Sequence, residues 1–136
     1  MIHRMITLSL FSLAASCATP QTNDAISESA AARLAEFEKT GTVETCLSSS
    51  RVEQITPLDE VHFLVRLGVN KYYLSVARSN CNNVDSAFTR IQYEIRGGQI
   101  CRNQLITVID SANSIPQGTC LLGAFEELKK IEEEQK

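Results

Sequence analysis

Cysteine constrains the fold of this chain more than any other residue, because five cysteines occur in 136 residues. Cys17 lies close to the N-terminus. The other four are spread through the rest of the sequence, at Cys46, Cys81, Cys101 and Cys120. An even number of cysteines in a short exported domain is typical of disulfide bonds. The four distal cysteines therefore predict two disulfides, provided that the chain leaves the cytoplasm.

The N-terminal segment has the three-part layout of a secretion signal. Residues 1–4 are short and positively charged, residues 5–15 are uncharged and mostly apolar, and small residues come directly before Cys17. The apolar run is too short to cross a bilayer as a helix, which takes about 20 residues. We therefore expect residues 1–16 to be a cleaved signal peptide.

The residues around the expected cleavage site, Leu-Ala-Ala-Ser-Cys at positions 13–17, resemble the lipobox of bacterial lipoproteins. They depart from that pattern at Leu13, which lies one residue further from the cysteine than usual. The resemblance implies a lipid on Cys17, a flexible tether over residues 17–24 and delivery to the outer membrane, facing the periplasm. The alternative is ordinary cleavage, for example after Ala18, which would remove Cys17 and give a soluble periplasmic or secreted protein.

The remaining residues, 25–136, have the length of a single domain. The net charge of −3 and the lack of clustered basic residues argue against nucleic acid as a partner. The expected partners are the membrane, through the lipid, and an envelope protein, whereas the sequence does not indicate an oligomeric state. Because no cysteines occur as a CxxC pair, we predict neither a metal site nor a cofactor, and zinc held by four thiolates is the alternative.

The pairing of the four distal cysteines is open to three arrangements. We favour Cys46 with Cys81 and Cys101 with Cys120, because partners that are close in sequence are easier to join. The other two pairings stay open.

Apolar residues recur at helical spacing near both ends of the domain. They are Ile26, Ala30, Leu34 and Phe37 in the first segment, and Phe125, Leu128 and Ile131 in the second. This periodicity predicts a helix over residues 25–39 and a second helix from about residue 125. In the second helix, Glu126 would pair with Lys130 one turn later.

Between these helices the apolar period is two, which is typical of strands. The predicted strands are residues 51–55, 61–67, 71–76, 88–95, 99–101, 105–109 and 119–122, of which the first and last are the weakest. Two hairpins are expected, around Gly68 and around Gly97–Gly98, and a loop at residues 111–118. The predicted fold class is α+β and mainly antiparallel β: a small curved sheet or partly open barrel of five or six short strands, with an N-terminal and a C-terminal helix.

The neighbourhoods of the distal cysteines resemble a family of small bacterial exported proteins known only as a domain of unknown function. The similar pieces are Cys46-Leu47, Arg51-Val52, Tyr73-Leu74 before Cys81, Gly98 to Arg102, Gly118 to Cys120 and Leu122 to Phe125, and they extend over about residues 40–125. The resemblance supports export and fold. It implies no activity, ligand or catalytic residue.

Three groups of residues suggest catalysis or binding. Asp59, His62 and a serine would make a nucleophilic triad, but no Gly-x-Ser-x-Gly elbow is present, so we interpret His62 as an ordinary strand histidine. Oxygen-bearing side chains in residues 80–85 suggest a calcium loop, but the glycine and distal glutamate of an EF-hand are missing. Arg90, Arg96 and Arg102 are interpreted as scattered surface charge rather than a basic rim for an acidic partner. No catalytic residue is predicted.

The sequence thus predicts a lipid-anchored protein of the bacterial cell envelope that acts as a non-enzymatic interaction module. A periplasmic binder or inhibitor of an enzyme is the alternative, because bacterial lysozyme inhibitors are similar in size and layout. A small hydrolase is the second alternative. A rigid projecting loop near residues 111–118 would favour the inhibitor, and a deep pocket lined by His62 and a carboxylate would favour the hydrolase.

Overall fold

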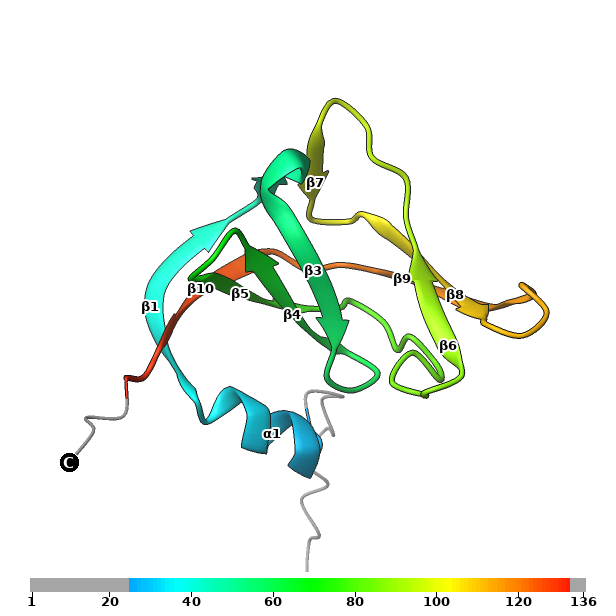
Figure 1. Cartoon of the computed structure of the whole chain (residues 1–136), viewed down its shortest axis with the longest axis horizontal. Helices are drawn as coiled ribbons and strands as arrows, with labels where there is room; N and C mark the ends of the chain where they lie inside the picture. The colour runs from blue at the N-terminus through cyan, green and yellow to red at the C-terminus, as the bar shows by residue number, and fades with distance from the viewer. Residues whose placement is uncertain (1–24, 133–136) are drawn as a thin grey trace, which may run out of the picture.

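The computed structural model describes residues 25–132, so the predicted signal peptide (residues 1–16), the tether (residues 17–24) and Cys17 lie outside the described residues. The described part is mainly antiparallel β structure with one short helix (Figure 1). Its elements are α1 Glu28–Leu34, β1 Phe37–Glu44, β2 Cys46–Ser48, β3 Val52–Pro57, β4 His62–Leu67, β5 Lys71–Val76, β6 Thr89–Gln92, β7 Gln99–Cys101, β8 Leu105–Asp110, β9 Pro116–Leu121 and β10 Phe125–Lys130. A short 3-10 turn, Ser49–Arg51, joins β2 to β3. Within this part of the chain, no helix has the length and apolar character needed to cross a bilayer.

The strands form three sheets that are open rather than closed into a barrel. The largest has five strands in the order β1-β10-β5-β4-β3. The second pairs β2 with β7, and the third has the order β6-β8-β9. The prediction of antiparallel β structure is therefore confirmed, but the described residues hold more strands, in more sheets, than the sequence indicated.

The main hydrophobic core lies between the five-stranded sheet and the two smaller sheets. The large sheet contributes Phe63, Tyr73 and Phe125, and the three-stranded sheet contributes Ile106 and Val108. All five side chains are almost fully buried. Burial of this apolar surface is what joins the three sheets into one body.

A second apolar cluster covers the opposite face of the five-stranded sheet. It consists of Phe37, Leu64, Leu74 and Leu128, with Leu34, Leu58, Tyr72 and Val76 packed against it. Leu64 breaks the alternation expected in its strand because this second cluster buries it as well. Tyr72 and Tyr73 point to opposite faces, as predicted, with Tyr73 in the main core and the Tyr72 ring 4.9 Å from that of Phe37.

The predicted C-terminal helix is wrong, because this segment is strand β10, between β1 and β5. Successive residues of a strand point to alternate faces, so Phe125 and Leu128, three residues apart, point to opposite faces. Phe125 enters the main core and Leu128 the second cluster. A strand that is buried on both faces can thus show apolar residues three positions apart, which is also the spacing on one face of a helix. Glu126 pairs with Lys39 of β1 at 2.9 Å, and not with Lys130.

Helix α1 is shorter than predicted. It begins after Ser27, whose hydroxyl accepts a hydrogen bond from the amide of Ala30, and it ends at Leu34. Phe37 belongs instead to strand β1, where it is buried in the second cluster. The prediction of a helix over residues 25–39 is therefore wrong beyond Leu34, because the apolar periodicity continues from a helix into a strand that covers the same face.

The hairpin of β4 and β5 is confirmed, with Gly68 at a positive φ of 56° in its turn. The second predicted hairpin is wrong, because the strands on the two sides of its turn do not pair with each other. Gly97 and Gly98 do form a turn, but β6 pairs with β8, and β7 pairs with β2. The strand predicted at residues 105–109 is confirmed as β8, in the middle of its sheet. Because β9 begins at Pro116, the predicted loop is shorter than expected.

Candidate functional site

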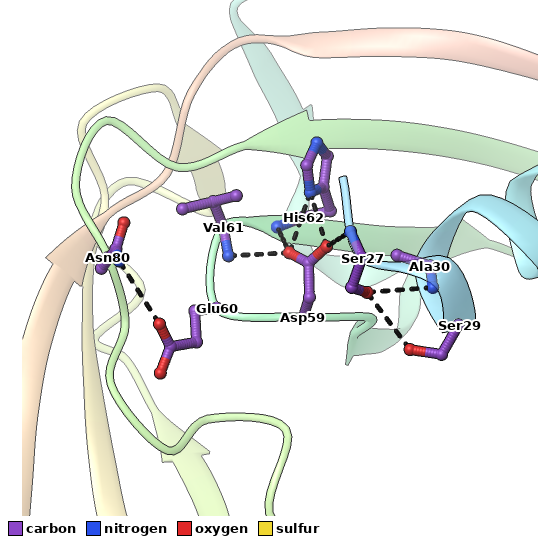
Figure 2. A network of polar contacts seen from close by, with 8 residues as sticks. All are labelled: Ser27, Ser29, Ala30, Asp59, Glu60, Val61, His62 and Asn80. Carbon is purple, nitrogen blue, oxygen red and sulfur yellow. Dashed lines mark hydrogen bonds and ion pairs between the residues drawn. The ribbon is translucent and has the colours of Figure 1, made fainter. Parts of the chain in front are cut away.

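A polar network is centred on Asp59, in the turn between β3 and β4 (Figure 2). Its Oδ1 accepts hydrogen bonds from the backbone amides of Val61 and His62, at 2.9 and 2.8 Å. Its Oδ2 accepts one from the amide of Ser27, at 3.1 Å. The imidazole Nδ1 of His62 lies 2.8 and 2.9 Å from the two oxygens. One carboxylate thus joins the start of α1 to the start of β4.

The electrostatic balance at Asp59 favours its charged form. Burial would raise the pKa of this carboxyl, but the hydrogen bonds from the amides of Val61, Ser27 and His62, together with the imidazole, outweigh burial. They lower the pKa of Asp59 from 3.8 to about 2. A carboxylate that accepts several amide hydrogen bonds is stabilised as the anion, since each bond is stronger to the charged form.

The Asp59 and His62 side chains form a buried pair, with side-chain exposures of 9% and 7%. They are therefore bonded partners and not merely neighbours in sequence. The arrangement holds two members of a triad, but no described hydroxyl bonds to the imidazole Nε2, which points away from Asp59 in Figure 2. The Ser27 hydroxyl caps α1, and the buried Ser75 hydroxyl donates to the carbonyl of Gly123 at 3.1 Å.

An open pocket of about 350 Å³ lies beside the network. Its lining is Ala25, Ser27, Asp59, Glu60, Val61, Asn80 and Asp85, so three carboxylates face it but His62 does not. Glu60 accepts a hydrogen bond from the Asn80 amide at 3.3 Å. Among residues 25–132, no group of three His, Cys, Asp or Glu side chains is arranged to hold a metal ion.

The segment considered as a calcium loop, residues 80–85, is a turn tied to its surroundings by backbone bonds. The Cys81 amide donates to the carbonyl of Glu60 at 2.8 Å, and the Val84 amide donates to the carbonyl of Cys81 at 3.1 Å. Asn83 has a positive φ of 61°, a conformation that asparagine tolerates better than most residues. Asn83 therefore has a conformational role in shaping the turn, and Asn80 donates a hydrogen bond to Glu60.

The four distal cysteines form two disulfides, but the favoured pairing is wrong. Cys46 is bonded to Cys101 and Cys81 to Cys120, across sequence separations of 55 and 39. Cys46 and Cys101 are directly opposite each other in the β2–β7 ladder. The entropic cost of closing a loop grows only slowly with its length, so the fold decides the pairing and sequence proximity does not. Because all four sulfurs are in disulfides, none remains as a thiolate for the zinc alternative.

The three arginines considered as a basic rim are on or near the smaller sheets, and two of them contact side chains of their own surroundings. Arg96 is 3.0 Å from the carboxylate of Glu94, and Arg90 donates to the Ser114 hydroxyl at 3.3 Å. Arg102 is exposed, and its amide donates to the carbonyl of Thr45. These contacts favour scattered surface charge over a common basic rim.

Ser27 is the part of the network that sequence reasoning missed. Its amide bonds to Asp59 across 32 residues, and no local pattern indicates that contact. The pairing of Asp59 with His62 has a sequence signal, because an aspartate just before a strand often accepts amide hydrogen bonds from the residues that follow it.

Comparisons of the chain with protein-family models, with curated proteins and with solved structures found no match. The resemblance of its cysteine neighbourhoods to a family of exported proteins therefore stays a prediction from the sequence.

Proposed function

We propose that the protein is a lipid-anchored component of the bacterial cell envelope that acts as a non-enzymatic interaction module. The observation that carries this proposal is the presence of two disulfides in one small domain. Disulfides form and persist in oxidising compartments outside the cytoplasm. The signal-like N-terminus and the lipobox-like residues before Cys17 support the same compartment.

The contacts of Asp59 and His62 support an interaction module over a hydrolase. The Asp59 carboxylate accepts hydrogen bonds from three backbone amides and pairs with one imidazole. These contacts connect α1 to the sheet. The pocket beside it is not lined by His62. A hydrolase of the kind considered would need a base and a nucleophile facing the same substrate-sized space.

The arrangement of the elements is compatible with a tethered domain. In Figure 1, α1 lies at one end of the molecule, and the connection from β6 to β7 lies at the opposite end. A lipid on Cys17 would hold the α1 end near the membrane, since only residues 18–24 separate it from the described domain. The connection from β6 to β7 would then be presented away from the lipid.

The lipid anchor is tested by metabolic labelling with palmitate. The wild-type protein should carry the label, and Cys17→Ser should lose it. Cys46→Ser combined with Cys101→Ser is the control, because it removes distal cysteines without leaving an unpaired thiol and should keep the label per molecule of protein. Equal labelling of the wild type and Cys17→Ser would contradict the anchor.

A second candidate function, binding and inhibition of a periplasmic enzyme, is favoured by the turn between β8 and β9. This turn projects from the molecule in Figure 1 and is held by its own side chains. Asp110 Oδ1 accepts from the amides of Ala112 and Asn113, at 2.8 and 3.1 Å, and Asn113 Oδ1 accepts from the amide of Ile115 at 2.9 Å. Phe88 and Ile115 beside it are 78% and 55% exposed. A preformed loop with exposed apolar side chains loses little entropy on binding.

Capture of partners from envelope extract separates the two candidates. For the inhibitor, the wild type should retain an enzyme and reduce its activity, and Phe88→Ser should lose both effects. Val69→Ser is the control, because Val69 is 83% exposed in the turn between β4 and β5, far from Phe88 in sequence. Retention of an envelope protein without an effect on any enzymatic activity would contradict the inhibitor and support the interaction module.

A further inference from the structure

A second pocket of about 350 Å³ lies where two strands of the three-stranded sheet separate. Strand β6 pairs with β8 as far as Gln92, which is opposite Thr107. After this pair the chain leaves β8 and rises to the turn at Gly97 and Gly98 (Figure 1). The pocket occupies the resulting wedge. One wall is formed by residues that follow Ile91, and the other by residues 103–107.

Contacts inside the protein fix both walls. On the first wall, Tyr93 packs against the main core, and Arg96 bridges to Gln99 across the two-glycine turn. On the second wall, the Asn103 amide donates to the carbonyl of Leu122 at 2.8 Å. The Asn103 Oδ1 accepts a hydrogen bond from Arg78 at 2.8 Å. The pocket is therefore largely preformed, which lowers the entropic cost of filling it.

The polar lining combines donors and acceptors with no excess of charge. The amide-bearing side chains are Gln92, Asn103 and Gln104, and the hydroxyl-bearing ones are Tyr93 and Thr107. The charged members, Glu94 and Arg96, lie 3.0 Å apart and neutralise each other. None of the side-chain hydrogen bonds within residues 25–132 uses Gln92, Tyr93 or Thr107, so these groups are available to a ligand.

The apolar part of the lining is the half-buried ring of Tyr93 and the side chain of Leu105, which is 50% exposed. An aromatic ring with a polar hydroxyl can contact a ligand through its face and through its edge. The matching ligand has hydroxyl groups that both donate and accept, apolar C–H faces and no net charge. The lining holds one guanidinium and one carboxylate, so it has no net charge that would select a charged ligand.

We propose that this pocket binds a neutral saccharide. This inference deepens the proposed function by naming a class of ligand. It rests on that function only for the location of the saccharide, which is the cell envelope. The connection from β6 to β7, which supplies one wall of the pocket, lies at the end of the molecule opposite α1 in Figure 1, so a lipid on Cys17 would leave that wall accessible.

The test is a titration of the whole chain, purified in detergent and labelled with ¹⁵N, with three neutral probes: tetra-N-acetylchitotetraose, cellotetraose and maltotetraose. At least one probe should give saturable amide shifts that are largest in residues 92–96 and 103–107. Combining Gln92→Ala with Thr107→Val should raise the dissociation constant of that probe by about tenfold or more, since two hydrogen bonds are lost.

The control combines Gln117→Ala with Thr119→Val. Thr119 is opposite Thr107 in the β8–β9 ladder but does not line the pocket, so this variant should bind like the wild type. Absence of saturable shifts with all three probes, or shifts located elsewhere, would overturn the saccharide site. Neither result touches the palmitate experiment, so failure of the site and failure of the lipid anchor are distinguishable.

Discussion

At the scale of single residues, Asp59 shows how a short polar side chain can replace apolar packing at the edge of a small domain. It is buried and accepts amide hydrogen bonds from Ser27, at the start of α1, and from His62, at the start of β4. Helix α1 has only seven residues, which is too short to be stable by itself in water. We infer that its position depends on the Ser27–Asp59 bond and on the packing of Ala30 and Leu34.

This inference predicts a stability that depends on pH. The pKa of Asp59 falls from 3.8 to about 2 on folding, so its contribution is fully present above pH 3.8 and is lost as the pH falls toward 2. The contribution is about 2 kcal/mol. The difference in unfolding free energy between the wild type and Asp59→Asn, measured with urea, should therefore shrink between about pH 4 and pH 2. Asp85→Asn is the exposed control, and a difference that does not change with pH would contradict the account.

Gly123 is a second residue whose identity is set by its surroundings. A Cβ atom at this position would collide with the backbone carbonyl of Val76 on β5, whereas a Cβ at Gly118 would meet no atom within 4 Å. Gly123→Ala should therefore lower the unfolding free energy by about 1–3 kcal/mol. Gly118→Ala should change it by less than about 0.5 kcal/mol. Equal effects of the two substitutions in denaturant titrations would show that the close approach is not present in solution.

At the scale of elements, the sequence predicted β8 and the β4–β5 hairpin correctly but assigned β10 to a helix. Strand β8 and the β4–β5 hairpin follow their apolar pattern closely. Strand β10 does not, because its apolar residues at three-residue spacing belong to two clusters on opposite faces of the sheet. The period of an apolar pattern thus depends on how many faces are covered, which a local sequence does not reveal.

The strand assignment of β10 is tested by a pair of substitutions. Leu128 is 4% exposed in the second cluster, and Leu128→Ala should lower the unfolding free energy by about 2–4 kcal/mol. Ile131, which would share a face with Leu128 in the expected helix, is 47% exposed. Ile131→Ala should therefore change the unfolding free energy by less than about 0.5 kcal/mol. In a helix that used both residues on one buried face, the two costs would be similar, and that result would contradict the strand.

The partners of each strand were harder to predict than its existence. Turn residues such as Gly97 and Gly98 indicated a reversal of the chain, and the reversal is present. They did not indicate that the strands on either side pair with β8 and β2 instead of with each other. Strand pairing is decided by contacts between distant parts of the sequence, as is the contact of Ser27 with Asp59 in the candidate site.

At the scale of the whole molecule, the two disulfides join parts of the chain that the sheets bring together. Cys46–Cys101 closes the two-stranded sheet, and Cys81–Cys120 ties the segment after β5 to β9 in the main core. In the chain-entropy model each bond stabilises the fold by about 4 kcal/mol, which is a large fraction of the roughly 5–15 kcal/mol typical of a domain. The number of cysteines predicted the use of disulfides, and only the fold determined their connectivity.

The most direct test of the account is peptide mapping of the unreduced protein isolated from the cell envelope, with free thiols blocked at lysis. We expect two linked peptide pairs, Cys46 with Cys101 and Cys81 with Cys120, and no blocked thiol on these four residues. A protein recovered from the envelope with free thiols at these positions, or with another pairing, would contradict the disulfide-bonded fold and the compartment inferred from it.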